Sequence, residues 1–432
     1  MRRRHTPTAV CATIIASALV LAPAAAATGD VASEGFWYFD VFNIQAAHDA
    51  GLTGEGVTIA VIDTQLNLEV PTLQGADIEV TDPSCYDENG DVISPTSTDL
   101  GAVHGTNIVS YLVGSGEGYP GQTGVKGIVP DARIIYTNNG TLGPDGQFVC
   151  GNEDFTDDGN GIADGIRAAI AGDADIISLS LGKQPSEADT AALAEALNAG
   201  IVVVGSVANS IGRQGGEFPS GMNGVVGVQS LASTGEVQGT GDGSFESHTD
   251  ARTDVAGPGS GIVWQGDGTW EQQKLARGTS LATPIVAGFL ALVAQKYPEA
   301  TGNQLIQSLI HNTGVDDHPL EYDESMLYGF GTASATHMLR VDPSQYEDVN
   351  PLLTDDPAVR PTLDEIAAAT PGDTDPTSAP TEQPGDQQEG APVGLIIGIA
   401  AGLVVVAVVI LILVMRSRRN RSTPTPPAGA GY

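Results

Sequence analysis

A regular alternation of short apolar runs with longer helical patterns extends from Gly35 to Asp342, and it restricts the possible folds more than any other feature. The short runs are nearly continuous in aliphatic residues, which is typical of strands buried on both faces. Strand and helix in turn predict an α/β fold with a mostly parallel sheet and helices on both of its faces. The predicted strands are 57–62, 133–136, 175–181 and 201–207, and the predicted helices are 106–113, 162–171 and 187–198.

The N-terminal end has the pattern of a signal peptide. Three arginines at 2–4 precede an apolar run over 9–22 and a stretch of alanines. The alternative, an uncleaved first membrane helix, needs about 20 apolar residues, and this run is shorter. We therefore expect residues 1–27 to be removed by cleavage after Ala26 or Ala27.

A second apolar run, without charges, covers 393–415. As a helix it would reach about 35 Å, which is enough to cross a bilayer. Arginines follow directly in 416–432, and positive charge beside a span stays on the cytoplasmic side. We expect a single-pass protein of the cell membrane with an extracytoplasmic folded part and a cytoplasmic tail. A sorting signal cut by a transpeptidase is the alternative, although no LPxTG-like motif precedes the run.

The segment 346–392 is rich in Pro, Thr, Asp, Glu, Gln and Gly and poor in apolar residues. Such a composition cannot bury a core. We expect a flexible stalk that joins a folded domain at 28–345 to the membrane span.

The charge of the chain is strongly acidic. Of 18 basic residues, three lie in the expected signal peptide and four in the expected tail, which leaves 11 against 53 acidic residues, a net charge of about −42. Nucleic-acid binding is excluded because the phosphate backbone would be repelled. Solubility in a salty or acidic exterior is the simplest explanation. Selection of basic substrates or of calcium is the alternative.

The cysteines agree with export. Cys11 lies in the expected signal peptide, so only Cys85 and Cys150 remain, an even number in an oxidising compartment. A disulfide between them would stabilise the fold by roughly 4 kcal/mol in the chain-entropy model. Two separate thiols are the alternative. Two ligands are too few for a structural zinc site.

Three polar residues lie at the ends of predicted elements. Asp63 follows a strand, His104 precedes a helical pattern, and Ser280 stands directly before an apolar helix. Taken singly, Asp63 would be a turn residue or helix cap, His104 a packing residue and Ser280 an N-cap. A nucleophilic serine, however, needs an imidazole to take its proton and a carboxylate to orient that imidazole. The chain order Asp, His, Ser is the order known for subtilisin.

Four segments, 61–64, 104–106, 253–259 and 278–284, together resemble the subtilisin-like serine proteases. The resemblance implies a serine endopeptidase that hydrolyses peptides or proteins through an acyl-enzyme. It also implies the roles of the three residues, with Ser280 as nucleophile, His104 as base and Asp63 as the group that orients the imidazole.

The resemblance assigns further residues. Asn209 would donate its side-chain amide to the oxyanion, together with the backbone N–H of Ser280. Ser180, Leu181 and Gly182 would pair with an extended substrate. Without the resemblance, Asn209 would be a turn residue and the other three a strand end.

Two positions depart from the family pattern. Gln65 stands where a glycine usually follows the Asp-Thr pair, so the adjacent loop must be rebuilt if that position needs unusual dihedral angles. Val207 and Ala208 stand where Ala-Gly is usual, which alters the floor of the pocket. Neither change removes a catalytic group.

The layout of the chain resembles the mycosins, the subtilisin-like proteases associated with type VII secretion in actinobacteria. Only about 36 residues separate the expected cleavage site from Asp63, too few for an inhibitory pro-domain. The cysteine pair, the stalk and the single C-terminal span complete the likeness. A membrane secretion complex is therefore an expected partner.

An acidic loop at 154–161 has the composition of a calcium site, but Gly165 occupies the twelfth position, where the EF-hand pattern requires a glutamate. We interpret the loop as a turn that leads into the next helix. We expect no metal and no cofactor, and calcium stays open without an assigned site.

Tethering beside an export channel favours limited processing of exported proteins, because emerging chains meet the enzyme at high effective concentration. A degradative protease with broad substrates is one alternative. The other is a structural partner that stabilises a secretion complex, with secondary or lost proteolysis.

Overall fold

The computed structural model describes residues 31–82, 85–87, 89–142, 148–150, 161–209, 218–237 and 250–370. All of them belong to a compact unit that ends at Asp373. The expected signal peptide, membrane span and cytoplasmic tail lie outside the described residues, as does the stalk from 371 onward.

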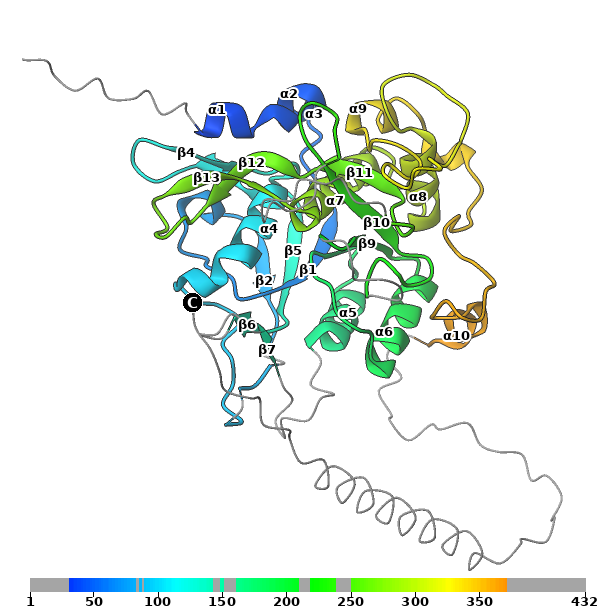
Figure 1. Ribbon diagram of the computed structural model, residues 1–432, viewed down its shortest axis with the longest axis horizontal. Helices are drawn as coiled ribbons and strands as arrows, with labels where there is room; N and C mark the ends of the chain where they lie inside the picture. Colours follow the sequence, from blue (N-terminus) through cyan, green and yellow to red (C-terminus); the bar gives the residue numbers. More distant parts are fainter. Residues whose placement is uncertain are drawn as a thin grey trace, which may run out of the picture. The chain divides into compact units, whose positions relative to one another are not determined.

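A seven-stranded sheet lies at the centre of this unit, with all neighbouring strands parallel (Figure 1). The strand order is β11-β10-β9-β8-β1-β5-β2. These strands are β1 (Thr58–Asp63), β2 (Ile78–Val80), β5 (Arg133–Asn138), β8 (Ile176–Leu179), β9 (Val202–Ser206), β10 (Val226–Leu231) and β11 (Val255–Pro258). The antiparallel pairs are β3 (Ser115–Glu117) with β4 (Thr123–Lys126), β6 (Thr141–Leu142) with β7 (Phe148–Val149), and β12 (Ser260–Gln265) with β13 (Gln273–Arg277).

Helices cover both faces of the sheet. They are α1 (Val31–Gly35), α2 (Trp37–Val41), α3 (Ile44–Asp49), α4 (Val103–Val113), α5 (Gly161–Ala171), α6 (Glu187–Asn198), α7 (Thr279–Lys296), α8 (Gly302–His311), α9 (Ala335–Met338) and α10 (Leu363–Ala368). The described residues also form the short 3₁₀ helices η1 (Pro71–Leu73), η2 (Leu100–Ala102) and η3 (Pro343–Gln345).

Strand β1 shows how the two faces are built. Its side chains alternate, so Ile59 and Val61 join one buried cluster while Ala60 and Ile62 join the other. The first cluster includes α4, α7 and α8, and the second includes α5 and α6, which Figure 1 shows together on one side of the sheet. Both faces are apolar, which explains why the strands read as continuous apolar runs.

The predicted elements are confirmed, with shifted ends. The four predicted strands are β1, β5, β8 and β9, and the three predicted helices are α4, α5 and α6. Helix α4 begins at Val103, three residues before the predicted start, so His104 lies inside its first turn. Helix α7 is largely apolar, and 83% of its residues are buried. Among the described residues it is the one helix long and apolar enough to cross a membrane.

The N-terminal residues pack on the body of the unit. Helix α1 contacts β12 and β13, and the indole nitrogen of Trp37 donates to the Ser260 carbonyl at 3.1 Å. The rings of Phe42 and Phe289, which lies on α7, are 5.0 Å apart. These contacts join the N-terminal helices to the sheet-covering helix α7 and to the β12-β13 hairpin.

The predicted boundary of the flexible stalk is wrong for residues 346–370, which pack against the folded unit and include α10. We call this segment the C-terminal strap. It holds most of the apolar residues of the expected stalk, whereas 371–392 have almost none. Ile366 is buried, and Leu352 packs against the core. Amide side chains on the body also hold it, for example Asn198 Nδ2, which donates to the Ala369 carbonyl at 2.7 Å. Composition does not reveal such bonds to main-chain carbonyls.

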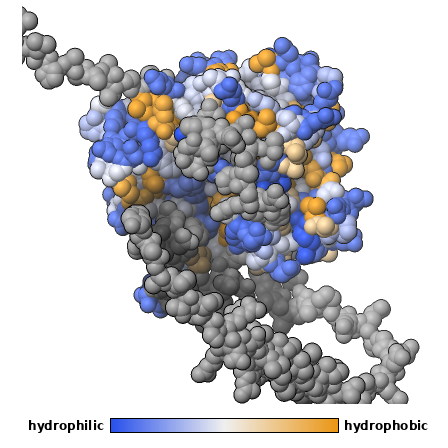
Figure 2. Space-filling view, viewed as in Figure 1, coloured by the Kyte–Doolittle hydropathy of each residue, from blue (hydrophilic) through white to orange (hydrophobic). Residues whose placement is uncertain are grey.

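The visible face of the unit in Figure 2 is largely hydrophilic, and its apolar residues are scattered. The most exposed large apolar side chains are Val315, Val41, Val349 and Val92, which come from separate parts of the chain. Scattered exposed residues of this kind are normal on a soluble surface.

Asp254 links β10 to β11 from a partly buried position. Its N–H donates to the Gly227 carbonyl at 2.8 Å, and its Oδ2 accepts from the Gly227 N–H at 2.7 Å. Burial raises the pKa of Asp254 to about 7, although the bond from Gly227 lowers it in part. The folded unit therefore holds a proton at Asp254 under mildly acidic conditions.

Because Asp254 is protonated in the folded state, we expect the free energy of unfolding to fall as pH rises. The pKa of Asp254 in the folded state lies above its unfolded value near 3.8. The contribution of this proton to the free energy of unfolding is therefore complete below pH 3.8 and is lost as pH rises through about 7. The loss amounts to about 4 kcal/mol. Urea unfolding between pH 4 and pH 8 should show this slope. Asp254→Asn should flatten it, and parallel pH curves for the two proteins would contradict the assignment.

Candidate active site

Three neighbouring strands of the parallel sheet deliver polar residues to one edge. Asp63 is the last residue of β1, Ser180 follows β8, and Asn209 follows β9. Because β9, β8 and β1 are adjacent and parallel, their carboxyl ends lie side by side. Helices α4 and α7 add His104 and Ser280 from their first turns. The structure thus brings these five residues to the same edge.

Asp63 and His104 form a short hydrogen bond. The distance from Asp63 Oδ1 to His104 Nδ1 is 2.6 Å, and Asp63 is only 2% exposed. The same oxygen accepts from the Thr64 N–H at 2.7 Å and from the Thr64 hydroxyl at 3.2 Å. With Nδ1 facing a carboxylate, that nitrogen carries the proton, so Nε2 is the ring nitrogen that can accept one.

Helix α4 approaches β1 closely at Gly105. A Cβ atom there would collide with the Tyr136 hydroxyl and lie 2.8 Å and 3.0 Å from the carbonyl oxygens of Gln65 and Thr64. Only a glycine permits this close approach of the two backbones. It holds the start of α4 beside the end of β1, which places His104 within reach of Asp63.

Two opposing effects determine the protonation of His104. Burial lowers the pKa of His104, whereas the charge of Asp63 and the hydrogen bond to it raise it, and the net pKa lies above the ordinary value. The imidazole accepts a proton only when it is neutral. Any reaction that uses it as a base is therefore lost as pH falls through this raised pKa.

Ser280 is the second residue of α7, and Gly278 is the N-cap, so the simple reading of Ser280 as a capping residue does not apply. The N–H groups of a first helical turn have no partner within the helix and carry the positive end of its dipole. The Ser180 hydroxyl donates to the Ser280 carbonyl at 2.7 Å. This bond ties the start of α7 to the end of β8.

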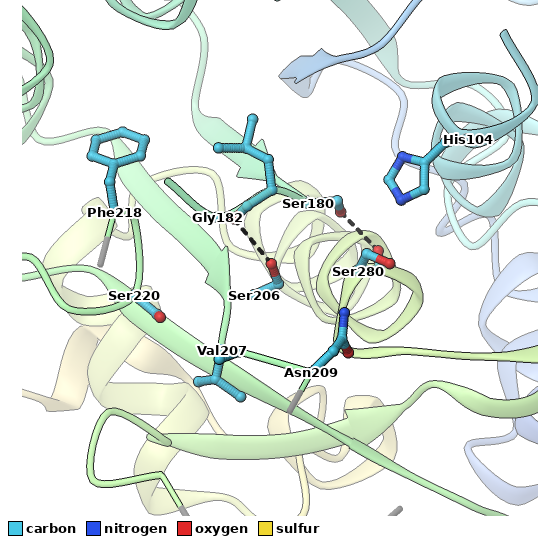
Figure 3. Close-up of a pocket in the computed structure, with 11 residues that line it drawn as sticks. His104, Ser180, Gly182, Ser206, Val207, Asn209, Phe218, Ser220 and Ser280 are labelled. Carbon is cyan, nitrogen blue, oxygen red and sulfur yellow. Dashed lines mark hydrogen bonds between the residues drawn. The ribbon is translucent and has the colours of Figure 1, made fainter. Parts of the chain in front are cut away.

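The side chain of Asn209 is oriented by Thr279. Its Oδ1 accepts from the Thr279 N–H at 2.9 Å and from the Thr279 hydroxyl at 2.8 Å. The amide nitrogen therefore points away from Thr279, and Figure 3 shows it on the side of Ser280. The Asn209 amide and the first turn of α7 thus present hydrogen-bond donors around one space.

A cavity of about 280 Å³ adjoins these groups (Figure 3). Its described lining carries hydroxyl and apolar groups but no carboxylate or ammonium group. The cavity can therefore accept an uncharged side chain. Its lining residues are His104, Ser180, Leu181, Gly182, Ser206, Val207, Ala208, Asn209, Phe218, Ser220 and Ser280.

The departure at Gln65 does not disturb the loop beside Asp63. Gln65 is not among the residues with positive φ, so the position does not require glycine. Its Nε2 donates to the Ser94 carbonyl at 2.9 Å, and its Oε1 accepts from the Thr141 hydroxyl at 2.8 Å. The glutamine thus links two loops at the rim of the site.

Cys85 and Cys150 are joined by a disulfide, as the sequence predicts. Cys150 follows β7, which pairs with the strand that carries Thr141. The Thr141 hydroxyl bonds to Gln65, so the disulfide adds a covalent link to the same rim. It closes a loop that contains His104.

Sequence reasoning missed several residues of the site. The ring of Trp264 meets His104 edge-on, with ring centroids 6.0 Å apart. Trp264 lies on β12, which α4 holds through two bonds between Asn107 and the Gln265 main chain, both 2.8 Å long. Phe218 and Ser220 line the cavity from a segment without a recognisable motif. Only the tertiary fold brings these residues to His104 and Ser280.

In the parts of the chain that the structure describes, no group of three or more His, Cys, Asp or Glu residues has the geometry of a metal site. The acidic residues 154–160 lie outside the described part, so the structure does not test the calcium interpretation.

Comparison with known families decides the identity of this arrangement. The profile of the subtilase family, Peptidase_S8, matches residues 54–332. The chain belongs to the subtilase family. The match covers the strands and helices that carry Asp63, His104 and Ser280, and it makes this subtilase a subtilisin-like serine endopeptidase whose substrates are peptides or proteins.

Its curated relatives are bacterial proteases. The thermostable alkaline protease of Halalkalibacterium halodurans is 29% identical over 300 residues, which cover 68% of this chain and 72% of the relative. Subtilisin BL of Lederbergia lenta is 29% identical over 305 residues, which cover 69% of this chain and 96% of the relative.

Solved structures show the same fold. MycP1 from Mycobacterium smegmatis has a TM-score of 0.54 and 19% identity, covering 76% of this chain and 89% of its own. MycP1 from the ESX-1 type VII secretion system has a TM-score of 0.54 and 21% identity, covering 73% and 88%. At these identities the likeness concerns the fold of this subtilase.

Proposed function

We propose that this subtilase is a membrane-anchored, extracytoplasmic endopeptidase in which Asp63, His104 and Ser280 form the catalytic triad. The observation that carries the proposal is the 2.6 Å bond between Asp63 Oδ1 and His104 Nδ1, beside a cavity that Ser280 also lines. Asp63 orients the imidazole through Nδ1, so that Nε2 faces the serine hydroxyl.

The reaction then proceeds in two steps. The Ser280 oxygen attacks the substrate carbonyl while His104 Nε2 takes its proton, and the carbon–nitrogen bond breaks as His104 passes that proton to the leaving amine. Water hydrolyses the resulting ester by the same proton path in reverse. The Asn209 amide and the Ser280 N–H stabilise the negative oxygen of each tetrahedral intermediate.

Substrate binding uses the edge of β8. An extended peptide can pair with Ser180, Leu181 and Gly182 as an added strand. The side chain of the peptide residue directly before the cleaved bond can then enter the cavity. The lining favours an uncharged side chain there. Val207 and Ala208, which replace the usual Ala-Gly pair, line the cavity, and their larger side chains favour a substrate side chain of modest size.

The sequence supports a place at the cell membrane. The expected signal peptide at 1–27 and the apolar run at 393–415 would hold the enzyme outside the cell by one C-terminal span. Together with the shared fold of MycP1 from a type VII secretion system, this favours processing of exported proteins near such a system. Its partners would be an exported protein substrate and a membrane secretion complex, and its site needs no cofactor.

Labelling with a fluorophosphonate probe tests the proposal. The full chain in detergent should react covalently with the probe, because the probe reports an activated serine. Ser280→Ala should abolish the labelling while circular dichroism shows an unchanged fold. A folded wild-type chain that stays unlabelled would contradict an active triad and would favour the structural role in a secretion complex.

A further inference from the structure

One wall of the substrate cavity comes from a short loop, residues 218–225, which we call the pocket loop. Phe218 and Ser220 line the cavity. The main chain of Phe218 exchanges two hydrogen bonds with Lys183, of 2.9 Å and 3.2 Å, directly after the substrate-pairing residue Gly182. The first half of the pocket loop is thus joined to the other wall of the cavity.

The second half of the pocket loop is bonded to the C-terminal strap through Asn223, which is 1% exposed. Its Nδ2 donates to the carbonyls of Thr354 and Pro361, both at 3.0 Å. Its Oδ1 accepts from the Thr354 N–H at 2.8 Å. Its own N–H donates to the Arg360 carbonyl at 2.8 Å. The side chain of Asn223 is therefore committed to the strap rather than to the cavity.

A neighbouring residue strengthens this attachment from the strap side. Asn350 Nδ2 donates to the Gly224 carbonyl at 2.9 Å, and Asn350 is 6% exposed. Gly224 has a φ of +74°, and a Cβ atom there would lie 2.8 Å from Leu353 and 3.0 Å from Asn350. The strap thus lies directly against the pocket loop, without room for another side chain.

The turn between the two ends of the pocket loop is tightly packed. Met222 is buried, and its N–H donates to the Pro219 carbonyl at 3.0 Å, so the turn between Ser220 and Asn223 is closed and packed. A packed interior transmits a displacement because it has few voids that could absorb it. A shift of Asn223 must therefore move the wall at Phe218 and Ser220.

We propose that the C-terminal strap sets the shape of the substrate cavity through Asn223, and so sets the preference of the enzyme for the side chain before the cut. The inference rests on the proposed function, because it assigns the cavity to the substrate. Asn223 is a positioning residue, since its bonds go to the strap and not to the reacting atoms. The strap belongs to the specificity machinery although its sequence resembles a stalk.

The test compares three single variants of the full chain. Asn223→Ala removes the bonds from the pocket loop, and Asn350→Ala removes one bond from the strap without changing the loop. Asn198→Ala is the matched control, because it also removes a bond from an asparagine amide to a strap carbonyl, but from α6. Each is assayed for kcat/KM on two peptides that differ only in alanine or leucine before the cut.

We expect Asn223→Ala to change the leucine-to-alanine ratio of kcat/KM by about 5- to 10-fold, the range of a modest change in a side-chain pocket. Asn350→Ala should shift the ratio in the same direction by a smaller factor, and Asn198→Ala should keep the wild-type ratio. A merely structural role would lower both kcat/KM values together through loss of folded enzyme and leave the ratio constant.

Two results would overturn the inference: wild-type ratios in the Asn223→Ala and Asn350→Ala variants, or an equal shift in Asn198→Ala. If Asn223→Ala does not fold, Asn350→Ala alone decides by its ratio. A wild-type chain without activity and without probe labelling would instead contradict the proposed function, so the two failures are distinguishable.

Discussion

Ser280→Ala is expected to lower kcat for peptide hydrolysis by about 10⁶-fold, the loss known for subtilisin, to which this chain is related. The hydroxyl oxygen forms the new bond to the substrate, so without it the imidazole has no proton to take. Adding His104→Ala to this variant should cost little more, because the two residues act as one unit. Steady-state rates on a chromogenic peptide, with enzyme concentration determined from absorbance, measure both effects.

Ser220→Ala serves as the matched control, since Ser220 lines the same cavity without a place in the proposed triad. We expect its kcat to stay within about tenfold of the wild-type value. Independent, additive losses in the Ser280→Ala/His104→Ala double variant would contradict the shared role of the two residues. A comparable loss in Ser220→Ala would show that the cavity serines act through packing.

Asp63→Asn is expected to lower kcat at neutral pH by about 10⁴-fold, the effect known for the equivalent change in another serine protease. The substitution keeps the shape of the side chain but removes the carboxylate charge beside His104 Nδ1. An amide nitrogen facing Nδ1 would also select the wrong tautomer of the imidazole. The large loss therefore reports the 2.6 Å bond between Asp63 and His104.

The pH dependence of kcat/KM provides a second measurement on the Asp63→Asn variant. The charge of Asp63 raises the pKa of His104, so its removal should move the acidic limb of kcat/KM to lower pH. Trp264 can follow this titration without turnover, because a protonated imidazole quenches a neighbouring indole and the two rings are 6.0 Å apart. Trp264→Phe supplies the fluorescence blank. An acidic limb at the same pH in Asp63→Asn would contradict the assignment.

A second His–Asp pair provides the control for Asp63→Asn. Asp317 Oδ1 lies 3.0 Å from His337 Nε2, in a part of the chain that does not line the cavity. Asp317→Asn also removes a carboxylate from a histidine, so a general effect of lost charge would appear in both variants. We expect wild-type kcat and pH profile for Asp317→Asn.

The sheet and its active edge could be predicted because their signals are local. Continuous aliphatic runs marked β1, β5, β8 and β9, and in a parallel sheet their carboxyl ends must lie together. The start of α4 is harder to predict from the sequence, because Gly105 has poor helix propensity. The glycine is required there because the end of β1 approaches the helix closely. Strands such as β11 and β13 have no comparable pattern, because β11 is short and ends in Gly257 and Pro258, and β13 is partly exposed and carries polar residues.

The rest of the site depends on contacts that composition does not encode. Trp264 reaches His104 only because Asn107 holds the main chain of β12 against α4. Phe218 becomes a cavity wall through main-chain bonds with Lys183. The C-terminal strap shares acidic residues and prolines with the segment that follows it, so composition does not separate the two. Its docking relies on hydrogen bonds to carbonyl groups, which composition does not reveal. In each case the decisive partner lies far along the chain.

The strap offers mostly main-chain atoms to the pocket loop. In four of the five described bonds between them, the strap contributes a carbonyl or an N–H of Thr354, Arg360 or Pro361, and only Asn350 uses its side chain. Any residue that follows the same backbone path presents the same atoms. The strap can therefore drift in sequence, or be exchanged between relatives, and still dock, while Asn223 on the enzyme body has no equivalent replacement.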